Sequence, residues 1–175
     1  MTPVELQRAA SELFPDTGAG TLADALGVDY TTTWRYFQRE TVPGPVAAAI
    51  TAWLQLSRQF EIAPPRKVCD TQEFDRLVEL ISPGTKEKSG LSGIEAAAFL
   101  VFGENWKGKF CQCAKIDAST LWRQIVNDNV SGPVSAAMRA WLMIWKLTGQ
   151  APQVSASPKT PAKKKMPTYA RLLLD

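Results

Sequence analysis

A repeated segment constrains this chain more than any other feature of its sequence. The stretch TTTWRYFQRETVPGPVAAAITAWLQL (31–56) returns as STLWRQIVNDNVSGPVSAAMRAWLMI (119–144), and Trp34 and Trp122 set an offset of 88 residues. Without a gap, the same offset aligns further pairs: Phe14 with Phe102, Gly20 with Gly108, and Asp29 with Asp117. Repetition at a fixed offset indicates duplication, so the 175 residues are predicted to form two related units.

The spacing of apolar residues predicts an all-α fold, and no segment shows the sustained alternation of a β-strand. Thr2, Pro3 and Glu5 have the spacing of a capped helix start, because a threonine and a glutamate three residues later can bond each other's backbone N–H groups. The predicted apolar stripe of this first helix is Val4, Leu6, Ala9, Leu13 and Phe14.

Turn chemistry divides the rest of the first unit. Helices are predicted over 21–27, 30–40 and 45–59, separated from the first helix and from each other by PDTGAG, Gly27 and VPGP. Asp29 is expected to cap the third helix, and Pro45 to open the fourth. The inward face of the fourth helix is predicted to hold Val46, Ala49, Ile50, Trp53 and Leu54.

Two short helices joined by a small-residue turn form the helix-turn-helix pattern. The segment LADALGVDYTTTWRYF (22–37) resembles the central unit of the Cro and lambda-repressor type of DNA-binding domain. In this resemblance Ala23 is the small residue before the turn, Gly27 the turn glycine, and Val28 the buried residue after it. The resemblance covers 2–58 and, more weakly, 92–147, and implies an all-α chain with two tandem helix-turn-helix domains.

The second unit departs from this pattern at two positions. Cys111 and Ile116 keep the small and apolar places, but Lys115 replaces the turn glycine. This predicts either a non-glycine residue in the left-handed region, at a cost of roughly 1 kcal/mol, or a turn of different shape. Gln124 replaces Tyr36, and Ile125 is expected to take over its inward position.

The resemblance implies a sequence-specific regulator of bacterial or phage type that binds double-stranded DNA with the third helix of each unit in the major groove. Arg35 and Arg123 are the leading candidates, because a guanidinium can bond a guanine edge twice. The predicted base readers are Tyr30, Thr31, Arg35 and Gln38 in the first unit, and Ala118, Ser119, Arg123 and Asn127 in the second. The predicted phosphate anchors are Thr21, Lys107 and Lys109. The unlike faces predict two unlike half-sites.

The tryptophans fall into two groups. Trp53 and Trp141 lie among alanines at helical spacing and are predicted to be core residues. Trp34 and Trp122 lie at the edge of the outward face, where packing on the first helix and contact with DNA are both open. Helix-turn-helix-like units also serve as protein-interaction modules, so an adaptor that binds RNA polymerase or another protein is the alternative function.

Charge divides the chain into an acidic body and a basic tail. Residues 1–150 hold fifteen basic and sixteen acidic side chains, a formal charge of −1. The tail beyond them holds Lys159, Lys163, Lys164, Lys165 and Arg171 against Asp175. The tail lysines 163–165 are therefore predicted to supply part of any attraction to DNA phosphates.

Four regions are predicted along the chain: a first domain (1–60), a linker with an extra helix (61–91), a second domain (92–150) and a disordered tail (151–175). The extra helix is predicted over 71–81, with Thr71 or Asp70 as its cap, and SPGTKEKSG after it as a break. The tail ends in an apolar cluster, predicted either to bind a partner or to pack on the body: Tyr169, Leu172 and Leu173.

Residue types argue against several other classes of protein. The chain has no histidine and three cysteines, so Ser-His and Cys-His catalysis are excluded, and neither an enzyme nor a metal or cofactor site is expected. Cys69, Cys111 and Cys113 are predicted to be small buried thiols. No apolar run reaches the length of a membrane span and the first residues do not resemble a secretory signal, so a cytoplasmic, nucleoid-associated protein is expected.

Overall fold

The computed structural model describes residues 1–15 and 18–153, and over these residues the chain contains ten α-helices and no strand. The helices are α1 (Pro3–Leu13), α2 (Gly18–Leu26), α3 (Tyr30–Gln38), α4 (Gly44–Phe60), α5 (Thr71–Ile81), α6 (Thr85–Ser89), α7 (Gly93–Phe102), α8 (Trp106–Ala114), α9 (Ala118–Val126) and α10 (Gly132–Thr148). The all-α prediction is thus confirmed for this part. Lys163–Lys165, Tyr169, Leu172 and Leu173 lie outside the described residues.

The duplication is present in the backbone as well as in the sequence. At the offset of 88 residues, α2, α3 and α4 coincide in both bounds with α8, α9 and α10, and α1 corresponds to α7 with a small shift. We call α1–α4 the first repeat and α7–α10 the second repeat. The helices α5 and α6 lie between the repeats in sequence and have no counterpart in the first.

The start of α1 forms the predicted capping box. Thr2 Oγ1 accepts a hydrogen bond from the Glu5 backbone N–H at 3.2 Å, and Glu5 Oε2 accepts one from the Thr2 backbone N–H at 2.6 Å. The prediction that Val4 belongs to the apolar stripe is wrong, because its side chain is 67% exposed whereas Leu6 is fully buried. Each helical residue advances about 100°, so Val4 and Leu6 point to nearly opposite sides.

Other boundaries differ from the sequence prediction. The second helix begins at Gly18 rather than Thr21, and the third ends at Gln38. A short helix, α6, forms in the segment predicted as a break, between Gly84 and Gly90, which both adopt left-handed backbone conformations. The extension of α2 and the formation of α6 share one cause: glycine lowers local helix propensity, but packing decides whether a turn of helix forms.

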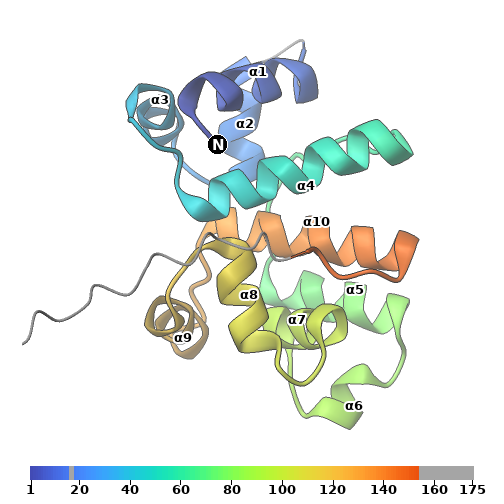
Figure 1. The fold of residues 1–175 in the computed structure, drawn as a ribbon. Coiled ribbons are helices and arrows are strands. Elements are labelled where there is room, and N and C mark those ends of the chain that lie inside the picture. Colours follow the sequence, from blue (N-terminus) through green and yellow to red (C-terminus); the bar gives the residue numbers. More distant parts are fainter. Residues whose placement is uncertain (16–17, 154–175) are drawn as a thin grey trace, which may run out of the picture.

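The helices α4 and α10 lie side by side at the centre of the molecule, with α1–α3 on one side and α5–α9 on the other (Figure 1). Trp53 on α4 packs edge-on against Phe14, with ring centroids 6.2 Å apart. Trp141 on α10 packs edge-on against Phe102 and Phe110. Both tryptophans are buried, which confirms that they belong to the core.

The extra helix α5 packs along α7 and so supports the second repeat. Asp70 is its cap, since the side chain accepts a hydrogen bond from the Glu73 backbone N–H at 2.7 Å. Phe74 and Val78 are its buried residues. This cover explains why α7, GIEAAAFLVF, is apolar on nearly all sides whereas α1 carries polar residues on one face.

Candidate nucleic-acid interface

The turns before α3 and α9 follow the same backbone path with different residues. Gly27 has a φ of 60°, and the Val28 N–H donates to the Ala23 carbonyl oxygen at 3.0 Å. In the second repeat the Ile116 N–H donates to the Cys111 carbonyl oxygen at 3.1 Å. Lys115 has φ 53° and ψ 47°, so it adopts the left-handed conformation that Gly27 occupies in the first repeat. The turn therefore has the same shape in both repeats, and in the second repeat Lys115 adopts the strained left-handed conformation.

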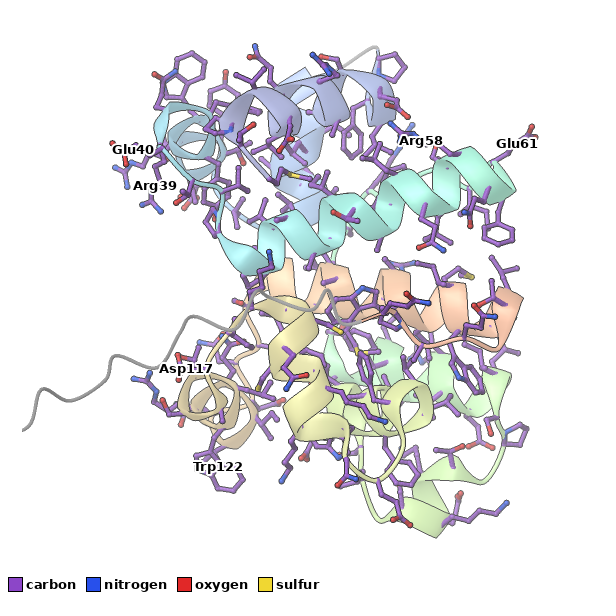
Figure 2. All side chains as sticks on the ribbon, in the orientation of Figure 1. Arg39, Glu40, Arg58, Glu61, Asp117 and Trp122 are labelled. Atoms are coloured by element: carbon purple, nitrogen blue, oxygen red, sulfur yellow. The ribbon has the colours of Figure 1, made fainter. Side chains whose placement is uncertain are left out.

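The helices α3 and α9 lie at the same end of the molecule, where α4 and α10 both begin (Figure 1). Figure 2 shows Arg39 and Glu40 projecting outward beside α3, and Asp117 and Trp122 projecting outward from α9. Arg58, by contrast, lies toward the far end of α4. The two helices proposed from sequence as readers therefore share one end of the molecule.

The outward faces of α3 and α9 carry large aromatic side chains. Trp34 is 53% exposed and Trp122 is 57% exposed, at equivalent positions of the two repeats. Neither ring is buried in the core, and contact of either ring with DNA stays a prediction. Tyr30 is 58% exposed, whereas Thr33 and Tyr36 on the opposite side of α3 are buried.

Like Tyr30, all the other residues predicted to read bases are exposed: Thr31, Arg35, Gln38, Ala118, Ser119, Arg123 and Asn127. Thr21, a predicted phosphate anchor, is half-buried in α2. The repeat offset pairs Gln38 with Val126 rather than with Asn127, and Val126 is 59% exposed. The outward face of α9 therefore ends in the apolar side chain of Val126, whereas that of α3 ends in the amide of Gln38.

The two predicted lysine anchors of the second repeat occupy different surroundings. Lys107 Nζ lies 5.4 Å from the ring centroid of Trp106 and 5.6 Å from that of Trp122, so its charge rests against two aromatic faces. Trp106 could not be predicted from the repeat, because position 18, its partner at the offset of 88 residues, is a glycine. Lys109 Nζ donates to the Phe102 carbonyl oxygen at 2.9 Å and so stabilises the end of α7.

Asp117 shapes the start of α9. Its carboxylate accepts hydrogen bonds from the Thr120 backbone N–H, the Thr120 hydroxyl and the Ser119 hydroxyl. These bonds, that of Ser119 first, lower the pKa of Asp117 well below its ordinary value. Asp29 occupies the same cap position before α3 but makes no side-chain bond to that helix. The hydroxyl of Ser119, a predicted base reader, is thus already hydrogen-bonded to Asp117, the cap residue of α9.

The three cysteines are free thiols, but only Cys69 is fully buried, so the prediction of buried thiols is wrong for Cys111 and Cys113, which are half-buried. Burial raises the pKa of Cys69 to about 12. Within residues 1–15 and 18–153, no group of three metal-ligating side chains is close enough to hold an ion.

Comparison with protein-family models, characterised proteins and solved structures gave no match to this chain. In the part of the chain that the structure describes, no helix has both the length and the hydrophobicity needed to cross a bilayer.

Proposed function

We propose that this protein binds double-stranded DNA as a transcriptional regulator, with α3 and α9 as the recognition helices of two tandem helix-turn-helix units. The observation that carries this proposal is the exposed Trp-Arg pair at the same position of both helices. Trp34 and Arg35 in the first repeat, and Trp122 and Arg123 in the second, lie outward at the same end of the molecule.

Tryptophan is enriched at binding interfaces, because its ring offers a large apolar area and its N–H a polar contact. Arginine offers two parallel donors to a guanine edge or a phosphate, and an aromatic ring beside it can contact sugars. The buried side of each helix differs between the repeats, whereas this outward pair does not. The shared chemistry is therefore on the exposed side, which is the side a duplex would meet.

The local charge supports phosphate contact only in places. Arg39 lies beside Glu40 just after the end of α3. On α9, the Arg123 guanidinium lies 3.4 Å from the Thr120 hydroxyl, which itself donates to the Asp117 carboxylate. Lys107 adds a positive charge beside Trp122. Since the first 150 residues carry a formal −1, we expect modest affinity for non-specific DNA from the body and a contribution from the basic residues beyond Gln153.

The test is retardation of a duplex by submicromolar protein over a series of salt concentrations, followed by selection of preferred sequences from a random pool. We expect binding that weakens as salt rises, and an enriched sequence. Arg35→Ala should lose preference at one base position, whereas Arg76→Ala, an exposed arginine on α5, is the matched control. Absence of any retardation at low salt would contradict the proposal.

A truncation after Gln153 tests the tail while retaining the hydrogen bond between Cys113 Sγ and the Pro152 carbonyl oxygen. We expect the salt slope to fall by up to roughly 0.9 for each phosphate that the tail no longer neutralises, with base preference retained. An unchanged slope would show that residues 1–153 bind without help from the lysines 163–165.

The second candidate is an adaptor that binds RNA polymerase or another protein, and the exposed tryptophans favour it because tryptophan is enriched in protein-binding hot spots. The double variant Trp34→Ala, Trp122→Ala separates the two functions. Under the adaptor hypothesis, the wild-type chain retards no duplex and regulation in cells is lost with the tryptophans. Under the DNA-binding proposal, the same variant weakens duplex binding directly.

A further inference from the structure

The glycines of the repeated Val-x-Gly-Pro-Val motif make contacts between the two repeats. Gly44, at the start of α4, lies against the end of α8 in the second repeat. A Cβ atom added to Gly44 would be 2.5 Å from Lys115 Cβ and 2.8 Å from the Ala114 carbonyl oxygen. Gly132, at the start of α10, lies against the end of α2 in the first repeat. A Cβ atom there would overlap the Leu26 carbonyl oxygen and lie 2.7 Å from that of Gly27.

Close approach, and not backbone conformation, is the reason for glycine at these two positions. Neither Gly44 nor Gly132 has a positive φ, so any residue could adopt their backbone conformation. The atoms in the way are backbone carbonyl oxygens and, at Gly44, the Cβ atom of Lys115, and none of these can turn aside as the end of a flexible side chain can. A side chain at either position would therefore push the two repeats apart.

The contacts are reciprocal. Positions 44 and 132 correspond at the repeat offset, and so do the turns they touch, Leu26–Gly27 and Ala114–Lys115. At the level of helices, α4 packs on α8, α10 packs on α2, and α4 packs on α10. Such an interface, in which each half contributes the same patch, is that of a two-fold symmetric dimer. Here both halves belong to one chain.

The interface is also braced by the segment that joins the repeats. Ser135 Oγ donates to the Cys69 carbonyl oxygen at 2.6 Å, in a buried position. Arg139 donates to the Lys67 carbonyl oxygen at 3.2 Å and lies 3.4 Å from a carboxylate oxygen of Glu73. In addition, all six residues of α10 from 133 to 138 are buried, because α2, α4 and α7 surround this helix. The two repeats are thus held in one fixed relation.

We propose that Gly44 and Gly132 set the distance and relative orientation of α3 and α9, and thereby select DNA sites by the spacing and inverted orientation of two unlike half-sites. The inference rests on the proposed DNA-binding function. Two-fold related readers meet the duplex in opposite directions, so the elements they read must also be inverted. The glycines touch no base; they act as positioning residues through the interface.

The first experiment uses the full-length wild-type chain and a pool of random duplexes. Each enriched duplex should contain two different elements at one separation, bound by a single chain as measured by sedimentation. Turning one element end for end, or inserting one base pair between the elements, should reduce affinity on the order of 100-fold, because only one repeat can then reach its element. One base pair rotates the second element by about 34° around the duplex axis.

The second experiment compares Gly132→Ala and Gly44→Ala with Gly20→Ala. A Cβ atom on Gly20 would meet nothing within 4 Å, so this variant is the matched control. We expect the two interface variants to change or lose the preferred spacing while affinity for a duplex with one element stays within about twofold. Such a separation would not arise from general loss of stability, which lowers binding to every duplex alike.

The outcomes are distinguishable. Enriched duplexes with a single element, with elements in the same orientation, or with no preferred spacing would overturn the inference and leave the proposed function intact. No enrichment at all would overturn both. If both interface variants keep the wild-type spacing, the glycines do not set it. If neither variant folds, the orientation and spacing series on the wild-type chain still decides whether the two repeats read inverted elements at one fixed spacing.

Discussion

The two repeats share one backbone but hold their recognition helices by different means. In the first repeat α3 is anchored by the buried side chains of Thr33 and Tyr36 and packs on α1. In the second, Leu121 is the only fully buried residue of α9. Gln124 replaces Tyr36, and its Oε1 accepts a hydrogen bond from the Ser131 backbone N–H at 3.1 Å. The helix α9 therefore depends more than α3 does on polar bonds at its ends.

The two repeats also differ in net charge. Residues 1–60 hold four basic and six acidic side chains, a formal −2, whereas residues 92–150 hold six basic and four acidic, a formal +2. Under the proposed function, we infer that the two repeats contribute differently to DNA binding. The first repeat presents a rigid face rich in hydrogen-bonding groups for base recognition, and the second contributes more of the attraction to phosphates.

The largest expected difference between the repeats is in stability. Tyr36→Ala should lower the free energy of unfolding by about 3 kcal/mol, because it empties a buried aromatic site. Gln124→Ala, the equivalent change, should cost about 1 kcal/mol, the worth of one hydrogen bond. Denaturant unfolding followed by circular dichroism measures both. Equal losses would show that α9 is anchored as firmly as α3.

The next effect is in DNA affinity. Arg35→Ala should weaken binding to a selected site by about 1 to 3 kcal/mol, and Arg123→Ala by less, since Arg123 Nε and Nη2 already lie 3.4 Å from acceptors on α9 itself. Titration of each variant against sites altered in one half gives the comparison. A larger loss for Arg123→Ala would assign base recognition chiefly to the second repeat.

A smaller effect concerns the turns. Lys115→Gly should stabilise the protein by about 0.5 to 1 kcal/mol, because glycine adopts the left-handed conformation without strain. Gly27→Ala should destabilise it, since its φ of 60° disfavours a side chain and the new Cβ would lie 2.9 Å from Val68. Thermal unfolding of both variants is the measurement. A destabilising Lys115→Gly would mean that the lysine side chain contributes packing that outweighs its strain.

The smallest effect concerns the helix caps and depends on pH. The pKa of Asp117 is lowered in the folded protein, so its contribution to stability is present above the ordinary value of 3.8 and is lost as pH falls below it. Asp117→Ala should therefore lower the melting temperature at neutral pH more than Asp29→Ala does, because only Asp117 bonds its helix. The gap between the variants should narrow in acid. A gap that persists unchanged in acid would assign the difference to packing.

The sequence was sufficient for the features that depend on local chemistry. The all-α class, the capping box at Thr2, the extra helix 71–81 and the register of the repeat all follow from spacings of a few residues or from direct identity. It also predicted outward positions for Arg35 and Arg123 correctly, because a helix of known phase has only one exposed side.

Tertiary structure alone decided the features that depend on contacts between distant segments. The motif around Gly44 and Gly132 is typical of a helix boundary, and nothing within it indicates that its glycine touches the other repeat. The exposure of Trp34, the location of Lys107 between two rings and the extension of α2 to Gly18 likewise arise from what packs nearby. Local propensities amount to a fraction of a kcal/mol per residue, whereas burial and steric overlap across an interface amount to several, so packing prevails wherever the two disagree.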